Sequence, residues 1–413
     1  MTVQINEELL DGSDYFADPA RRVELGEFFH FDQRRVLLGE GALDTLADEC
    51  GRLGLKRVLL VRDPGIVPLG ELVVSALNQG GVEVVGVFDK VISNPTVASV
   101  DQCAQAIKEA DCQGVITLGG GSTMDTVKAG RCVATSGGSI RDYFGFDMFK
   151  ESAAWPALAI PTTAGTGSEA GRVAVIADET GKKAVYSDQL TPEVALVDPQ
   201  LSRNLPPLLT AITGLDALGH ALECTASTKS NALGDAVARE SLRSGAPFFT
   251  RAVEGGAQDP EARLQMARCS LLAGLLLGPI NTGAGHALGY GIEKVSHAAG
   301  KPVPHGTAVA LVLPGVMRHN APAAADKYYY TAGVAGMDLG GKSRAEGVEL
   351  AAGWIDGLRR QYTPYGSLRQ AGLSAADIPQ MVELAMEVRR LLDPNPVVVT
   401  AADAEAIYRG VLE

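Results

Sequence analysis

The chain lacks any uninterrupted apolar run of about 18 residues, the length that a transmembrane helix needs, within its 413 residues. Its six cysteines form no CxxC pair, so reduced thiols are expected rather than a disulfide framework. It also lacks a basic surplus, because 36 Lys and Arg stand against 49 Asp and Glu, a net charge of −13. This charge repels nucleic acid and anionic membranes. Small-molecule chemistry in a reducing cytoplasm, with no nucleic acid or membrane partner, is therefore expected.

What the chain does contain is typical of a globular protein: 46% hydrophobic and 21% charged residues, with 48 scattered glycines. Its length exceeds the roughly 250 to 300 residues that one core supports, which predicts two domains. The first residues, MTVQINEELLDGSDYFAD, are acidic and lack an apolar core, so no secretory signal is expected. Residues 1–30 are expected to form an N-terminal extension.

Hydrophobic periodicity divides the chain into two parts. Up to about residue 200, β-rich runs such as RVLLVR, GVITLGG, RVAVIAD and VALVDP recur, and the early ones alternate with helical segments. This pattern predicts an α/β domain with a parallel sheet over 31–205, which binds ligands beyond the carboxyl ends of its strands. Apolar residues at helical spacing then predict an all-helical domain over 206–413. A cleft between the domains is the expected substrate site.

The segment VITLGGGSTMDTVKAG (115–130) is predicted to be a strand, three glycines and a helix start. Glycines let backbone N–H groups approach a phosphate, and the helix start adds positive dipole character. A pyrophosphate site is therefore predicted, although a tight turn without a ligand also explains this motif, which matches neither standard nucleotide fingerprint. A second loop, PTTAGTGSEA (161–170), offers hydroxyls and free amides. Two such loops favour one extended ligand.

An acidic residue, Asp63, ends the run VLLVRD. At a strand end, such a side chain can accept hydrogen bonds from the adenosine ribose hydroxyls and would repel a 2′-phosphate. NAD is thus favoured over NADP. A solvated turn residue before Pro64 is an equally good explanation of the same position.

A candidate metal site begins with GLDALGHALE (214–223), which places Asp216 and His220 on one stripe of an apolar helix. Glu223 lies on the same side. His286 and His305 complete a possible Asp-His-His-His set. These oxygen and nitrogen donors suit Fe(II), Zn(II) or another first-row divalent ion.

The remaining histidines have weaker cases. His30 and His319 stand singly beside apolar residues and are expected to be packing residues. His297 lies between two proposed ligands and stays ambiguous between a catalytic and a structural role.

Taken together, these motifs resemble the iron-containing (group III) alcohol dehydrogenase family. They stand in the order of that family: RVLLGEGAL at 35–43, GGGSxxDxxK at 119–128, TTAGTGSE at 162–169, VALVDP at 194–199, TGxDAxxH at 213–220 and PHG at 304–306. The resemblance implies a dehydroquinate synthase-like architecture, with an N-terminal dinucleotide-binding domain and a helical C-terminal domain. It also implies a nicotinamide cofactor, a divalent metal and a homodimer or larger assembly.

Matching positions carry the family's site residues onto this chain. The implied metal ligands are Asp216, His220, His286 and His305. The implied cofactor-binding residues are Asp63, Gly119, Gly120, Gly121, Ser122, Asp125, Thr162, Thr163, Thr166, Ser168 and a lysine, either Lys182 or Lys183.

Two departures from the family concern the third ligand. Many relatives carry HxxxH, whose second histidine is suspected of relaying protons, whereas this chain has HALGY, ending in Tyr290. If His286 matched that second histidine, Thr282 would stand at the ligand position; we take His286 as the ligand. The stretch from His286 to His305 is also longer than expected, and its extra EKVSHAAGK segment contains His297. Tyr290 and His297 are the predicted proton-relay residues.

The predicted function is reversible hydride transfer between NAD and a primary alcohol or its aldehyde, with the metal at the substrate oxygen. One alternative is a metal-free reductase similar to the maleylacetate reductases. Another is a lyase or cyclase similar to dehydroquinate synthase, which needs a cluster of basic residues for its phosphorylated substrate. These motifs show no such cluster.

Overall fold

The computed structural model describes residues 34–413, so the predicted extension over 1–30 and His30 lie outside the described residues. The chain forms two compact units. The α/β unit contains residues 34–206 and also Gly255–Gly278, and the helical unit contains Pro207–Glu254 and Pro279–Glu413. Each unit is thus assembled from separate stretches of the chain. We retain a start of the helical domain near residue 206 as a proposal.

The α/β unit is built on a six-stranded parallel sheet, which confirms the predicted fold class. Its order is β1-β9-β6-β4-β2-β3. The strands are β1 (Val36–Leu38), β2 (Arg57–Arg62), β3 (Glu83–Phe88), β4 (Gly114–Gly119), β6 (Ala157–Pro161) and β9 (Val194–Val197). The chain runs from β2 to β3 on one side and returns to β4 on the other. The direction of winding therefore reverses between β2 and β4.

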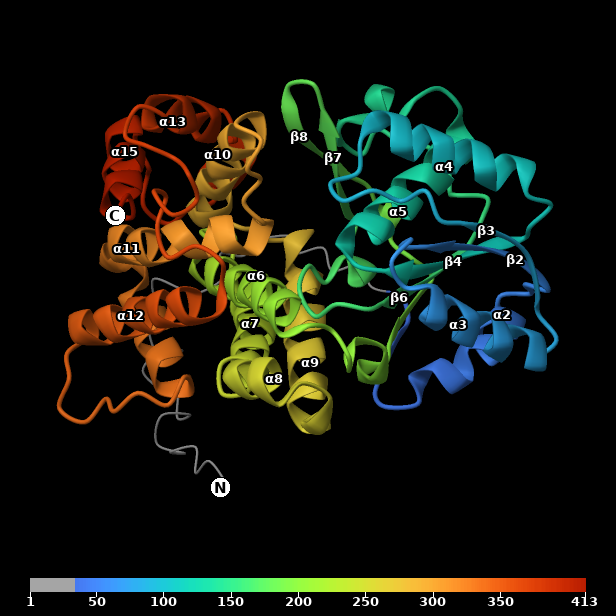
Figure 1. The fold of residues 1–413 in the computed structure, drawn as a ribbon, viewed down its shortest axis with the longest axis horizontal. Coiled ribbons are helices and arrows are strands. Elements are labelled where there is room, and N and C mark those ends of the chain that lie inside the picture. Colours follow the sequence, from blue (N-terminus) through green and yellow to red (C-terminus); the bar gives the residue numbers. More distant parts are fainter. Residues whose placement is uncertain (1–33) are drawn as a thin grey trace. The chain divides into compact units, whose positions relative to one another are not determined.

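Helices cover both faces of this sheet (Figure 1). They are α2 (Leu46–Arg52) and α3 (Val67–Gln79) on one face and α4 (Val97–Glu109) and α5 (Gly121–Ser136) on the other. Strand β2 shows why, because its side chains alternate between the faces. Val58 and Leu60 join the core under α2 and α3, whereas Leu59 and Val61 join the core under α4 and α5.

A second, three-stranded sheet contains β5 (Gly145–Phe146), β7 (Val173–Asp178) and β8 (Gly181–Tyr186). The run RVAVIAD, expected with the parallel strands, is β7 and pairs antiparallel with β8. Only two residues separate these strands, and the Asp178 carboxylate accepts hydrogen bonds from the N–H groups of Thr180 and Gly181 at 2.8 and 2.9 Å. A parallel pair needs a much longer connection, so this tight turn dictates the antiparallel pairing.

Helix α9 (Pro260–Leu277) belongs to the α/β unit although it follows all the strands in sequence. Its Ala267 and Leu271 form a small buried cluster with Ala170 and Val197. Its Gly274 touches the 161–170 loop so closely that a Cβ there would lie 2.3 Å from the carbonyl oxygen of Gly167. The helix therefore completes the core beside β1 and β9.

The helical unit contains no strand among its described residues, as predicted. Its helices are α6 (Pro207–Ala226), α7 (Ala232–Gly245), α8 (Phe249–Gly255), α10 (Ala284–Ala298), α11 (His305–Val334), α12 (Arg344–Tyr362), α13 (Ile378–Met386), α14 (Arg389–Leu392) and α15 (Ala401–Gly410). Helix α11 contains Pro314 and Pro322 and is kinked at Ala324. None of the described helices is long and apolar enough to cross a bilayer.

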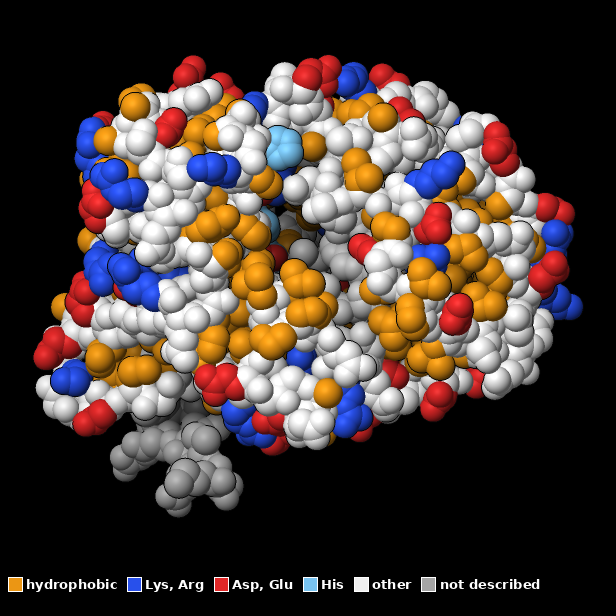
Figure 2. Space-filling view, in the orientation of Figure 1, with side chains coloured by type: hydrophobic (Ala, Val, Ile, Leu, Met, Phe, Trp, Pro, Cys, Tyr) orange, Lys and Arg blue, Asp and Glu red, His pale blue; other side chains and the backbone are white. Residues whose placement is uncertain are grey.

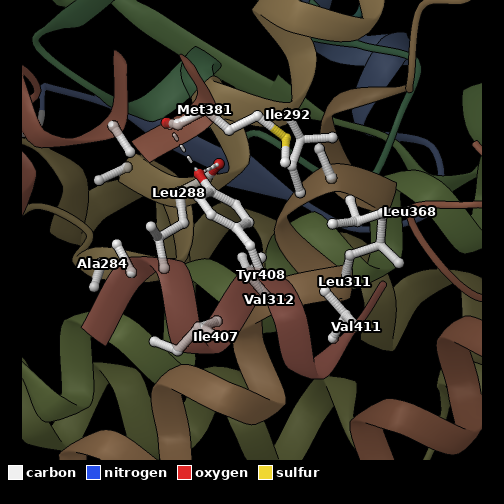
Figure 3. Close-up of a cluster of buried hydrophobic side chains, with 14 of the residues drawn as sticks. Ala284, Leu288, Ile292, Leu311, Val312, Leu368, Met381, Ile407, Tyr408 and Val411 are labelled. Carbon is white, nitrogen blue, oxygen red and sulfur yellow. Dashed lines mark hydrogen bonds between the residues drawn. The ribbon is translucent and has the colours of Figure 1, made fainter. Parts of the chain in front are cut away.

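The core around α10 fixes the helix that carries His286 (Figure 3). The Tyr408 hydroxyl of α15 donates a hydrogen bond to the Leu288 carbonyl oxygen at 2.7 Å. Gly291 permits this approach, because a Cβ on it would lie 2.6 Å from the Tyr408 hydroxyl oxygen and 2.5 Å from the Met381 carbonyl oxygen. Helices α13 and α15 therefore pack directly on the backbone of α10.

Candidate metal and cofactor sites

Helix α6 carries a buried polar stripe of Asp216, His220 and Glu223. Their spacing of four and three residues places them on one side of the helix. Only 4 to 5% of each residue is exposed. Buried polar groups are costly unless they are paired, so this stripe requires partners from other elements.

Three histidines meet Asp216 at one point of the helical unit. The Asp216 Oδ1 atom lies 3.6 Å from Nε2 of His220, 3.5 Å from Nε2 of His286 and 3.4 Å from Nε2 of His305. The rings of His220 and His286 stack with centroids 4.7 Å apart. Within the described part of the chain, Asp216 Oδ1 and His286 Nε2 are buried without a hydrogen-bond partner. Asp216, His286 and His305 each present a ligand atom within 4.8 Å of the other two. His220 joins them through its 3.6 Å contact with Asp216, so the four predicted ligands meet around Asp216.

The donor atoms of this cluster fit a divalent cation. For a tetrahedral site with metal–nitrogen distances of about 2.1 Å, neighbouring ligand atoms are about 3.4 Å apart. The three separations from Asp216 Oδ1 agree with this value. The two buried atoms without hydrogen bonds gain a partner if a cation binds between them.

The carboxylates of the cluster favour a positive charge between Asp216 and the histidines. Burial alone would raise the pKa of Asp216, but the three histidines hold it well below its usual range. Burial lowers the pKa of His220 to about 4. Burial also opposes protonation of His286, yet the carboxylates of Glu223 and Asp216 raise the pKa of His286 to about 10. A proton or a divalent cation can supply the positive charge that these carboxylates attract.

The carboxylate of Glu223 joins α6 to the start of α10. Its Oε1 accepts a hydrogen bond from the Gly285 N–H at 2.5 Å, and its Oε2 contacts His286 Nδ1. Gly283 and Gly285 leave room for it, because Cβ atoms there would lie 3.1 and 2.9 Å from Oε1. A carboxylate at a helix N-terminus is also stabilised by the helix dipole. Glu223 therefore both caps α10 and orients His286.

His305 is the first residue of α11, and its side chain is 26% exposed. Its Nδ1 lies 2.5 Å from Glu293 Oε1. The Tyr290 ring stacks on it with centroids 5.6 Å apart and 28° between the planes. The next residue of α11 is Gly306, which lies against the backbone of α6. Only glycine fits there, because a Cβ would lie 2.0 Å from the Ile212 carbonyl oxygen.

The other predicted polar residues of this unit lie differently. His297 is exposed near the end of α10, eleven residues after His286 and so about 16 Å further along the helix axis. Thr282 is buried, and its backbone N–H donates to Asn281 Oδ1 at 3.0 Å. It is His286, not Thr282, that faces Asp216. His319 Nε2 lies 3.1 Å from the Val398 carbonyl oxygen.

The two predicted cofactor loops of the α/β unit lie against each other. Cβ atoms on Gly120 and Gly121 would lie 3.3 Å from Thr163 Oγ1 and 2.5 Å from Thr166 Cγ2. Gly119 ends β4, and α5 begins with Gly120 at its N-cap without a side-chain cap. This glycine turn follows β4 beside the reversal of winding, where open α/β sheets bind ligands.

A buried lysine holds the second loop on α5. Lys128 Nζ donates hydrogen bonds to the carbonyl oxygens of Ser168 and Gly171 at 2.9 and 3.2 Å and contacts the carbonyl oxygen of Val173. The Ser168 hydroxyl donates to Asp125 Oδ1 at 2.5 Å. The side chains of Asp125 and Ser168 are thus engaged within the protein, and their role in cofactor binding stays a prediction.

The remaining predicted cofactor residues have local partners. Asp63 follows β2, and its Oδ1 accepts a hydrogen bond from the Gly65 N–H at 2.7 Å. The Ser122 hydroxyl accepts one from the Asn94 N–H at 3.2 Å, and the Thr162 N–H donates to the Gly119 carbonyl oxygen at 2.9 Å. Lys182 and Lys183 lie on β8, in the three-stranded sheet. Their part in cofactor binding also remains a prediction.

Comparison with known proteins decides the family. Residues 33–199 match the iron-containing alcohol dehydrogenase model and residues 210–412 match the model for the C-terminal domain of Fe-containing alcohol dehydrogenases. The chain belongs to the iron-containing alcohol dehydrogenase family. Membership makes it an oxidoreductase that interconverts an alcohol and its aldehyde, and implies a nicotinamide cofactor and a divalent metal.

Individual members of the family are similar over nearly the whole chain. The choline dehydrogenase of Bacillus subtilis is 35% identical, over 89% of this chain and 91% of that protein. The crystal structure of a 1,3-propanediol oxidoreductase is 31% identical with a TM-score of 0.88, covering 94% of this chain and 100% of the other. A sulfoacetaldehyde reductase from Bifidobacterium kashiwanohense, in complex with NAD+, is 29% identical with a TM-score of 0.81, covering 94% and 99%.

For this iron-containing alcohol dehydrogenase, two carboxylates beside the histidines had no role in the sequence-based prediction. Glu223 was placed on the ligand side of its helix, but its contact with His286 depends on α10. Glu293 stands seven residues after His286, a spacing that puts it on the same face of α10. That spacing is the signal from which its position near the cluster could have been predicted.

Proposed function

We propose that this enzyme transfers hydride reversibly between NAD and a primary alcohol or its aldehyde, at a divalent metal held by Asp216, His220, His286 and His305. The observation that carries the proposal is the convergence of three histidine Nε2 atoms within 3.4 to 3.6 Å of Asp216 Oδ1. We favour Fe(II) on the family's description, with Zn(II) as the alternative. Zinc binds such sites more tightly, so availability decides which metal is present.

The α/β unit would hold the cofactor through its two loops. Gly119, Gly120 and Gly121 leave the start of α5 open to a pyrophosphate, with Thr163 and Thr166 alongside. Asp63 follows β2, where its carboxylate would accept hydrogen bonds from the ribose hydroxyls. Its negative charge would repel the 2′-phosphate of NADP. The NAD+ complex of the sulfoacetaldehyde reductase supports the same choice of cofactor.

The residues around the metal would orient the substrate and move its proton. When bound, the cation would supply Lewis acidity toward the substrate oxygen, and the nicotinamide cofactor would supply the hydride chemistry. Neutral imidazoles and the Asp216 carboxylate hold the cation and balance part of its charge. Tyr290 stacks on His305 one helical turn after His286 and would pass the alcohol proton outward. His297, exposed at the end of the same helix, is the second relay candidate.

The proposed setting is the cytoplasm, with a small alcohol or aldehyde as substrate and a homodimer or larger assembly. The charge of −13 and the six cysteines, which form no disulfide, support this setting. On the face in Figure 2, acidic and basic side chains are interspersed, which disfavours nucleic acid as a partner. Light scattering that found a 43.1 kDa particle would contradict the assembly.

The test is elemental analysis of enzyme purified without chelator, combined with NADH oxidation against a panel of short aldehydes. We expect near-stoichiometric iron or zinc, and loss of both metal and activity in His286→Ala. His319→Ala, whose ring contacts Val398 instead, is the matched control and should keep both. A metal-free wild-type enzyme with full activity would refute the metal site and favour a metal-free reductase.

A further inference from the structure

One face of α10 supplies the proposed ligand His286 and also two residues that contact His305. His286, Tyr290 and Glu293 are four and three residues apart, so they share a stripe about 60° wide. His286 faces Asp216, Tyr290 stacks on His305, and Glu293 contacts the far nitrogen of His305. The helix therefore presents one histidine to the cluster and also supports another histidine that comes from α11.

His305 depends on this support more than the other two histidines do. Its side chain is 26% exposed, against 6% for His220 and 3% for His286. As the first residue of α11, it also follows the irregular segment 300–304. The surrounding core therefore does little to hold its ring. Apart from its edge-on contact with the His286 ring and its approach to Asp216, the ring is held by the Tyr290 stack and by the 2.5 Å contact between Nδ1 and Glu293 Oε1.

We infer that Glu293 is a positioning residue for the proposed metal site: it holds His305 in the tautomer and orientation that present Nε2 to the cation. A carboxylate at Nδ1 keeps the proton on that nitrogen and leaves the Nε2 lone pair for the metal, and it also makes the imidazole a better donor. This inference rests on the proposed function. It also gives the long stretch between the third and fourth ligands a role, since the extended α10 supplies Glu293.

Comparison with Glu223 shows how an effect on ligand orientation can be distinguished from an effect on folding. It supports His286 in the same way, but its other oxygen caps α10, so its removal also disturbs the helix. Glu293 also contacts a histidine, His305, but it lies inside α10 rather than at its start, and its side chain is 11% exposed. An isosteric change at Glu293 therefore tests the support of a ligand with less disturbance of the fold.

The experiment is a Co(II) titration of the full-length enzyme after metal removal, followed by visible absorption and by competition with a chromophoric chelator. Glu293→Gln should weaken Co(II) binding by about 10- to 100-fold and alter the absorption bands, while the thermal unfolding of the metal-free protein is unchanged. Glu293→Asp keeps the charge but withdraws it by one methylene group, so it should also bind Co(II) more weakly. Glu383→Gln, an exposed carboxylate on α13, is the control.

The outcomes distinguish the inference from the proposed function. Wild-type affinity and spectrum in Glu293→Gln, alongside loss of binding in His305→Ala, would overturn the inference alone. Wild-type affinity in Glu293→Asp with loss in Glu293→Gln would also overturn it, because charge rather than position would then matter. A wild-type protein that binds no Co(II), or a His305→Ala variant that binds it normally, would overturn both.

Discussion

Glu223 and His286 form a buried pair between α6 and α10, in which one carboxylate oxygen contacts the imidazole while the other caps the helix that carries it. Orientation of a proposed ligand and stability of its helix thus depend on one side chain. A substitution at Glu223 should affect both properties together.

We therefore predict that Glu223→Ala lowers the free energy of unfolding by about 3 kcal/mol, because removing one partner of a buried charged pair leaves the other uncompensated. Urea denaturation of the metal-free protein measures this loss. Glu240→Ala removes an exposed carboxylate 3.9 Å from Arg243, and should cost less than about 1 kcal/mol. Equal losses in the two variants would argue against the importance of the Glu223 contacts.

Tyr290→Phe keeps the ring that stacks on His305 and removes only the hydroxyl. If Tyr290 passes the alcohol proton, kcat should fall by about 100-fold, within the usual range for a lost proton-transfer group. The metal content should stay at the wild-type level. Steady-state kinetics at several pH values, with metal analysis of the same samples, measures both. An unchanged kcat and pH profile would exclude the relay role.

Two glycines on helices of the helical unit should respond in opposite ways to alanine. A Cβ on Gly291 would lie 2.5 Å from the Met381 carbonyl oxygen, so Gly291→Ala should destabilise the protein by about 1 to 3 kcal/mol. A Cβ on Gly353, on α12, would meet no atom within 4 Å, so Gly353→Ala should stabilise by about 0.5 to 1 kcal/mol. Paired urea denaturation curves give both values, and the same sign for both would contradict the packing argument.

The buried carboxyl of Glu169 should make stability depend on pH. Burial raises its pKa to about 7, from 4.5 in the unfolded chain. Between these values the folded protein keeps a proton that the unfolded chain has lost, so the free energy of unfolding falls as pH rises from 4.5 to 7.

Glu169→Gln removes this dependence, so its stability relative to wild type should improve between pH 4.5 and pH 8 by up to about 3 kcal/mol. Urea denaturation at both pH values measures the change. Glu151→Gln, at an exposed position, should show no such improvement. A constant difference between Glu169→Gln and wild type at the two pH values would mean that the carboxyl does not titrate in this range.

Asp63→Asn tests the choice of cofactor without breaking the turn after β2. The amide oxygen can still accept the hydrogen bond from the Gly65 N–H, while the charge that would repel a 2′-phosphate is lost. The preference for NADH over NADPH should fall by about tenfold, or roughly 1.4 kcal/mol. The kcat/KM values for the two cofactors measure this ratio. An unchanged ratio would assign Asp63 to the turn alone.

The sequence predicts local features of this fold well, because they depend on the spacing of a few residues. The stripe of Asp216 and His220 follows from four-residue spacing, and the glycine turn after β4 follows from its composition. What it does not predict depends on contacts between distant segments. The contact of Glu293 with His305 requires the meeting of α10 and α11. Strand β7 has the same apolar pattern as the parallel strands, and only the short turn after it determines its pairing.

The position of α9 in the sequence affects how the α/β unit folds during synthesis. Ala170 and Val197 have their apolar cover in Ala267 and Leu271, which a ribosome adds only after it has produced α6, α7 and α8 of the other unit. A fragment ending at Pro206 would therefore leave that surface bare and should be prone to aggregation. The nascent α/β unit cannot finish folding before the first segment of the helical unit, Pro207–Glu254, has been synthesised.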